Sequence, residues 1–245
     1  MIIRNGKTFG MGMVFAISFV SVLLLIFSPV FGGKNGLRFA DDSFNRLSKG
    51  SSYFIPKVAK SNEQFIGKTF SVALKADKPD DKPGDAEARA KNIARVFTAA
   101  GATATVTGTA LKIEGDLGRV LASALQDSDA MFNNRGEEVR AKYGTDNEKK
   151  LFLQWHESLT KVHKQFQKQK MIEESKIVSD VIKKAVEPAY NFYGIDSRKV
   201  VDHAGMMSGL LLFYVAYTMW WGYAIFYLFD GLGLSMKKAK VKKEA

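Results

Sequence analysis

The chain has 245 residues, of which 46% are apolar and 25% are charged, and its formal net charge is +11. It contains no cysteine, which excludes disulfides, thiolate metal sites, a catalytic cysteine and the C-x-x-C-H attachment of a c-type haem. A basic excess is typical of proteins that bind nucleic acid. Here about half of the excess flanks two long apolar stretches near the chain ends, where basic residues commonly set membrane orientation. We therefore expect no nucleic acid partner.

The first apolar stretch is predicted to be a membrane-spanning helix. Residues 1–10 form a short basic N-terminus, and residues 11–31 carry no charged side chain. A span needs about 20 apolar residues, whereas the core of a cleaved signal peptide usually has about 7 to 15 and ends in small residues at an A-x-A-like site. Because the core is longer here and only Gly32 and Gly33 follow it, we favour an uncleaved anchor over a signal peptide.

Residues 34–68 are interpreted as an extracytoplasmic linker, because their apolar pattern is weak. We expect a short helix near residues 41–49 and then extended chain through Pro56. Alternation with period two and helical spacing follow from residue 69 onward. These patterns predict the strand Phe70–Lys75, a helix capped by Asp85 that runs to Ala100, a hairpin of Ala102–Thr107 and Ala110–Glu114 around Gly108, and a helix capped by Asp116 that runs to Phe132.

Residues 69–132 are therefore predicted to be one α+β domain, with a three-stranded sheet and two helices on one of its faces. About 65 residues hold such a core only marginally, so we expect the domain to lean on a neighbouring element. A narrow apolar seam in residues 146–187 predicts either one long helix or two helices with a break near residues 165–170. Pro188 is expected to end this segment, because the residue before a proline avoids helical dihedral angles.

The second uncharged stretch, Ala204 to Phe229, has 26 residues and would form a helix about 39 Å long. This length crosses a hydrocarbon core of about 30 Å with some tilt. We expect residues 196–229 to form a juxtamembrane segment and the second transmembrane helix, with Asp196 or Ser197 as the helix cap. Residues 231–245 are a basic tail.

The basic residues near the spans predict the orientation of the chain. Two of them, Arg4 and Lys7, precede the first span, and lysines crowd the last nine residues. Because Lys and Arg favour the cytoplasmic side, we expect both termini in the cytoplasm and residues 34–203 outside. The fold class predicted is thus a membrane protein of the bacterial inner membrane, with two transmembrane helices flanking a periplasmic α+β domain and a long helix leading into the second span.

The second span carries the candidate site residues. Gly205, Ser208 and Gly209 form a small-residue motif that allows another helix to approach closely. Tyr214 and Tyr217 lie deeper, where phenol hydroxyl groups need partners, so we expect this helix to pack against protein. We expect the first span's outer half or, preferentially, another subunit's helix to pack on the glycines. At the mouth of the span, His203 is a candidate for contact with a quinone headgroup, a haem of a neighbouring subunit or a proton path, or else simply lies at the lipid interface.

No other motif predicts chemistry. His156 and His163 are seven residues apart, about 10 Å along a helix, which is too far to share a metal. Gly115 and Gly118 lack the lysine and the spacing of a phosphate loop. We expect no metal site, no cofactor and no enzymatic activity. The architecture predicts an accessory subunit that holds other membrane-protein subunits together. The alternative is a self-assembling regulator of envelope polymer chain length, which shares the two-span layout, although the proline-rich run usual in those proteins is missing.

Overall fold

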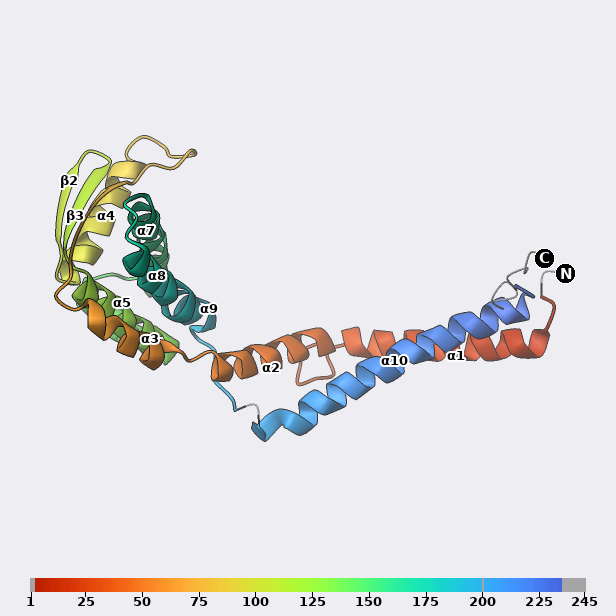
Figure 1. The fold of residues 1–245 in the computed structure, drawn as a ribbon. Coiled ribbons are helices and arrows are strands. Elements are labelled where there is room, and N and C mark those ends of the chain that lie inside the picture. The colour runs from red at the N-terminus through yellow and green to blue at the C-terminus, as the bar shows by residue number, and fades with distance from the viewer. Residues whose placement is uncertain (1–2, 200, 235–245) are drawn as a thin grey trace, which may run out of the picture. The chain divides into compact units, whose positions relative to one another are not determined.

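The computed structural model describes residues 3–199 and 201–234. The chain divides into two compact units, residues 1–47 with 198–245 and residues 48–197, which we call the helical unit and the α+β unit. Figure 1 shows the elements of both. Each unit is described by itself below.

The helical unit contains two helices that are long and apolar enough to cross a membrane. Helix α1 spans Gly6–Phe27, and its mean hydropathy reaches 2.5; the second, from Val201 to Gly231, reaches 1.3. The side chain of Asn5 caps α1 by accepting a hydrogen bond from the Thr8 N–H at 3.2 Å. The helix therefore starts inside the predicted basic N-terminus and ends before residue 31, because Ser28 is extended and Pro29 follows it.

The second long helix, α10, spans Ala204–Gly231 and follows a short 3-10 turn, η3, at Val201–His203. The prediction that Asp196 or Ser197 caps this helix is wrong, because residues 195–199 are irregular and His203 occupies the cap position without a side-chain hydrogen bond. In Figure 1, α10 runs alongside α1. The backbone N–H groups of Arg4 and Asn5 both donate to the Gly231 carbonyl, so the start of α1 meets the end of α10.

Residues 34–68 are mostly helical, which corrects the prediction of a linker with extended chain through Pro56, whereas the helix expected near residues 41–49 is present and longer than expected. Helix α2 spans Gly36–Ser51, helix α3 spans Ile55–Asn62, and a 3-10 turn, η1, spans Glu63–Phe65. Pro56 lies in the first turn of α3, where the missing N–H has no helical partner to lose. The apolar side chains of α2 recur at helical spacing at Leu37, Ala40, Phe44 and Leu47, so α2 has a polar and an apolar side.

The α+β unit contains the predicted three-stranded sheet. Strands β1 (Thr69–Lys75), β2 (Thr103–Thr107) and β3 (Ala110–Asp116) are antiparallel in the order β1-β3-β2. Their register pairs Val72 with Ile113 and Ala104 with Ile113. The turn between β2 and β3 uses Gly108 with φ +61°, a conformation that glycine adopts without steric cost. The sheet thus confirms the hairpin prediction and adds β1 beside β3.

One face of the sheet is buried, and two helices cover it. Helix α4 (Asp85–Ala99) follows the residue Gly84, which occupies the cap position predicted for Asp85. Helix α7 (Glu148–Lys168) lies on the same side (Figure 1). Aromatic contacts join the layers, with Phe97 and Trp155 centroids 5.4 Å apart and Phe70 and Phe166 centroids 5.9 Å apart. Helix α7, from outside residues 69–132, therefore completes the core, which meets the expectation that the small domain leans on a neighbour.

Helix α5 (Leu117–Phe132) is capped as predicted, since the Asp116 carboxylate accepts from the Arg119 N–H at 3.1 Å. It packs mainly on α3 and on α9 (Glu187–Phe192) and touches only the end of β3, so it is not the second helix on the sheet face. A short helix that the sequence did not predict, α6 (Gly136–Tyr143), follows it. The carboxylate of Asp127, which is 3% exposed, accepts from the Tyr143 hydroxyl at 2.5 Å and links α5 to α6.

Residues 146–187 form two helices and not one. Helix α7 ends at Lys168, Lys170 has φ +60°, and helix α8 (Ile172–Val181) turns back along α7. Helix α7 packs against α8 as well as against β1 and α4. A π-helical turn, η2 (Ile182–Val186), continues directly into α9, so Pro188 lies in the first turn of α9 and does not end the helical segment. The wider turn puts the Glu187 N–H on the Ile182 carbonyl, five residues back, and this local widening accommodates the proline ring.

Candidate interaction sites

The small residues predicted to form a packing interface lie on an open face of α10. Gly205, Ser208 and Gly209 are all exposed. Within the described residues, no atom outside the helix's own backbone lies within 4 Å of a Cβ built at Gly205 or Gly209. An α-helix turns about 100° per residue, so Ala216 falls on this face as well, about 20° from Gly205. We call the surface defined by Gly205, Ser208 and Gly209 the small face of α10; the same rotation places the exposed side chain of Leu212 between Gly209 and Ala216.

Other glycines of the same two helices are already used for close packing within the chain. A Cβ at Gly12 of α1 would lie 2.6 Å from the Leu228 backbone nitrogen, and one at Gly231 would lie 2.6 Å from Phe9 Cα. The α1–α10 pair therefore approaches at the end of α10 that is opposite to Gly205. The close contact within the chain therefore lies far along α10 from Gly205 and Gly209.

The two tyrosines predicted to need partners have different surroundings. Tyr217 donates its hydroxyl to the Phe19 carbonyl at 3.0 Å, and its ring stacks on that of Phe19 with centroids 4.1 Å apart. Trp220 adds a bond from Nε1 to the Ser18 hydroxyl at 3.2 Å. Tyr214 is 66% exposed, and its side chain forms no hydrogen bond with any described residue. Tyr217 thus belongs to the α1–α10 contact, whereas Tyr214 faces away from it.

Tyr214 lines an apolar groove between α2 and α10, which we call the α2–α10 groove. Its volume is about 500 Å³, and it is lined by Ala40, Phe44, Met207, Ser208, Leu210, Leu211 and Tyr214. Tyr214 is nine residues after Gly205, which places it about 180° around the helix from the small face. The first half of α10 therefore presents two surfaces, which meet at Ser208. The sequence carried a signal for the groove that the prediction missed, namely the apolar spacing of Ala40 and Phe44.

His203 lies at the start of α10 beside an arginine. The Arg198 Nη1 group donates to His203 Nε2 at 3.0 Å, and His203 Nδ1 donates to the Lys199 carbonyl at 3.3 Å. Arg198 has no carboxylate within 4.0 Å among the described residues. This end of α10 therefore carries an exposed guanidinium group.

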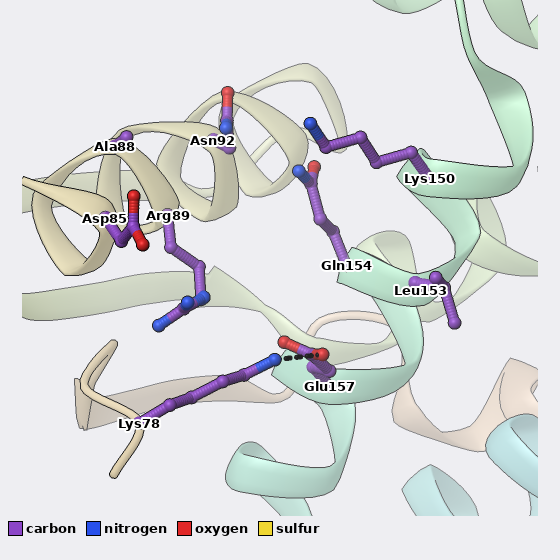
Figure 2. Close-up of a pocket in the computed structure, with 9 residues that line it drawn as sticks. All are labelled: Lys78, Asp85, Ala88, Arg89, Asn92, Lys150, Leu153, Gln154 and Glu157. Carbon is purple, nitrogen blue, oxygen red and sulfur yellow. Dashed lines mark hydrogen bonds and ion pairs between the residues drawn. The ribbon is translucent and has the colours of Figure 1, made fainter. Parts of the chain in front are cut away.

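The α+β unit has a polar groove of about 320 Å³ between α4 and α7. Figure 2 shows its side chains facing one another, with Lys78 Nζ and Glu157 Oε1 joined at 2.5 Å. Arg89 binds the Asp81 carboxylate through two bonds of 2.8 and 2.6 Å. The hydrogen bonds from Arg89 lower the pKa of Asp81 to about 2. The central charges of this groove are thus paired with each other and hold α4, α7 and the loop before α4 together.

Two lysines of the α+β unit are held by neutral oxygen atoms. Lys49 is 3% exposed and donates to the carbonyls of Phe192 and Ile195 at 3.1 and 2.5 Å. Lys161 donates to the Lys75 carbonyl. Burial lowers the pKa of both ammonium groups. Lowered lysine pKa values are common at functional sites, but these ammonium groups are bound to backbone carbonyls and tie segments of the fold to one another.

The remaining histidines join the helices of the α7–α9 segment. His156 Nε2 lies 3.0 Å from Glu187 Oε1, and His163 Nδ1 lies 2.8 Å from the Ser175 carbonyl. Among the described residues, no group of three or more histidine, aspartate or glutamate side chains is placed to hold a metal ion.

Comparison of the chain with protein-family models, with curated proteins and with solved structures found no match. The function is therefore argued from the geometry of the sites themselves. Among the surfaces described above, the small face of α10 is exposed, and no described residue packs on its two glycines.

Proposed function

We propose that this protein is a non-catalytic accessory subunit of a multi-subunit complex in the bacterial inner membrane. In this proposal α1 and α10 cross the bilayer, and the α+β unit lies in the periplasm. The length and hydropathy of both helices support the crossing. The α+β unit then supplies a folded surface on the outer side, and α10 supplies a packing surface inside the membrane.

The observation that carries the proposal is the open small face of α10. Helices in a membrane associate through close backbone approach at small residues, because lipid provides no hydrophobic driving force between them. The chain uses Gly12 and Gly231 in this way for its own helix pair. At Gly205 and Gly209 the same kind of surface has no neighbour from the described part of this chain. A transmembrane helix of another subunit fits this surface.

The orientation is supported by the basic residues at the ends of the chain. Arg4 and Lys7 flank the start of α1, and lysines follow α10. The start of α1 is hydrogen-bonded to the end of α10, so Arg4 and Lys7 lie at the end of the helix pair where α10 ends, and Lys and Arg favour the cytoplasmic side. Reporter fusions at Ala245 and in the loop of residues 77–84 test the orientation. We expect the loop to lie in the periplasm, so a reporter that works only in the periplasm should be active there. Activity in the loop of a reporter that works only in the cytoplasm would contradict the proposal.

The function is tested by purifying the full chain from membranes in a mild detergent and measuring the native mass of the particle. We expect the chain to copurify with different membrane subunits in a fixed ratio. A particle that contains only copies of this chain would contradict the accessory-subunit proposal and favour a self-assembling envelope regulator. A monomer that carries no other protein would contradict both.

A further inference from the structure

The α2–α10 groove is apolar along its length and differs from the small face in what it can bind. Its lining combines the apolar side of α2 with one side of the first half of α10. Among the lining residues only Ser208 and Tyr214 carry a polar group, and the ring of Tyr214 is apolar. Its volume of about 500 Å³ lies within the range of about 300–1,000 Å³ that is typical of ligand pockets. The small face allows a backbone to approach, whereas most side chains that line the groove are large and apolar.

Helix α2 has the properties of a helix that lies at a membrane surface. Leu37 and Phe44 on its apolar side are 55% and 44% exposed. Its opposite side carries Arg38, Asp42 and Arg46. Such a helix places its apolar side about 5–10 Å into the boundary between headgroups and acyl chains. The groove would then open toward the outer layer of lipid.

The groove has one end next to a positive charge, and the rest of its length is apolar. His203 lies one helical turn before Met207, so the Arg198–His203 pair is next to the Met207 end of the groove. From Met207 to Tyr214 the groove follows α10 for about 10 Å, which is within half of a hydrocarbon core about 30 Å thick. A cation at the outer end and an apolar channel leading inward match the headgroup and the tail of a lipid.

We propose that the α2–α10 groove binds one anionic phospholipid, with an acyl chain between Phe44 and Tyr214 and the phosphate at Arg198. The inference rests on the proposed function, because it places the start of α10 at the outer surface of the bilayer. The lipid phosphate supplies a negative partner for the exposed Arg198 guanidinium. The acyl chain covers apolar side chains of both α2 and α10 and so fixes α2 against α10.

The test uses the full chain purified in detergent and titrated with phosphatidylglycerol or phosphatidylcholine, with bound lipid counted by native mass spectrometry. Wild type should retain one phosphatidylglycerol molecule and prefer it over phosphatidylcholine. Arg198→Gln should lower this preference about fivefold, the ratio that corresponds to about 1 kcal/mol per basic residue at a membrane surface. Ala40→Trp should fill the groove and remove the retained lipid. Leu24→Trp, at an exposed position of α1 outside the groove lining, should leave lipid binding unchanged.

Equal lipid retention by Ala40→Trp and Leu24→Trp would overturn the inference, as would a wild-type protein without retained lipid. A dimer that only Ala40→Trp dissociates would also overturn it, because a second copy would then occupy the groove. Resistance of the protein to alkaline carbonate extraction from membranes separates this failure from that of the proposed function. A protein that resists extraction but retains no lipid contradicts only the lipid site, whereas an extractable protein contradicts the membrane-spanning proposal itself.

Discussion

Gly118 near the start of α5 gives a sharp test of the α+β unit. A Cβ built there would lie 2.5 Å from Ile66 Cα, whereas carbon atoms in contact are normally about 3.5–4.0 Å apart. Replacing Gly118 by alanine therefore requires the backbone at Ile66 to move by about 1 Å. That segment is also tied to α5, because Asn62 Nδ2 donates to the Gly118 carbonyl at 2.7 Å.

The expected magnitude follows from two opposing effects. Overpacking of a tight site costs about 1–3 kcal/mol, and we expect the upper end because the obstructing atoms belong to the backbone and cannot rotate away. Alanine in a helix regains up to about 1 kcal/mol relative to glycine. Gly118→Ala should therefore lower the free energy of unfolding by about 2 kcal/mol, which for a chain of this size corresponds to a melting temperature about 4–8 °C lower.

The assay is thermal unfolding of the full chain in detergent, followed by circular dichroism. Ala122→Gly, at an exposed position of the same helix, is the matched control and should cost about 1 kcal/mol through helix propensity. If propensity alone determined stability, the two substitutions would change the melting temperature in opposite directions. A Gly118→Ala protein as stable as wild type would refute the close approach of Ile66 to α5.

The same structure predicts losses at other contacts. Replacing the fully buried Phe166 by alanine should lower the free energy of unfolding by about 3–5 kcal/mol. A loss below about 1 kcal/mol in a urea titration would contradict the packing of α7 on the sheet. Gly12→Leu should lower the melting temperature in detergent more than Gly10→Leu, because only Gly12 faces α10 closely; equal effects would contradict the α1–α10 contact. Arg89 lowers the pKa of Asp81 to about 2, below the ordinary value of about 3.9, so this carboxylate contributes stability above about pH 4 that is lost as the pH falls toward about 2. Asp81→Asn should weaken the pH dependence of the free energy of unfolding over that range, and an unchanged dependence in urea titrations would argue against the ion pair.

Local patterns in the sequence predicted the sheet well. The alternation of β1 and of the β2–β3 hairpin, with Gly108 at the turn, is set by neighbouring residues. The cap at Asp116 is also local, because the side chain binds a backbone N–H three residues later. These features could be predicted because the interactions that decide them lie within a few residues.

The errors arose where a distant neighbour or an unusual turn decides the structure. Pro188 was expected to end a helix, but the π-helical turn before it lets the chain continue into α9. The sequence left open whether residues 146–187 form one helix or two, because periodicity alone does not show that α8 folds back along α7 after Lys170. Pro56 was taken as extended chain, although proline is favoured in the first turn of a helix.

The candidate site was predictable only in part. The small residues from Gly205 to Gly209 are visible as a spacing in the sequence, but their lack of a neighbour in the described chain is a property of the fold. Tyr217 is hydrogen-bonded to α1, whereas Tyr214 lines the α2–α10 groove. This difference depends on how α10 is rotated about its axis relative to α1 and α2. The proximity of Arg198 to His203 depends on the irregular segment before α10.

The small face of α10 is the central claim, and Gly209→Leu tests it most directly. A leucine at this position blocks the close approach of a partner helix, while membrane insertion should be retained because the span becomes more apolar. Gly222→Leu is the matched control, since Gly222 also lies in α10 with no atom outside the helix's own backbone within 4 Å of its Cβ position, among the residues described. On native gels of detergent-solubilised membranes, Gly209→Leu should dissociate the complex and Gly222→Leu should leave it intact. A complex that survives Gly209→Leu unchanged would contradict the account.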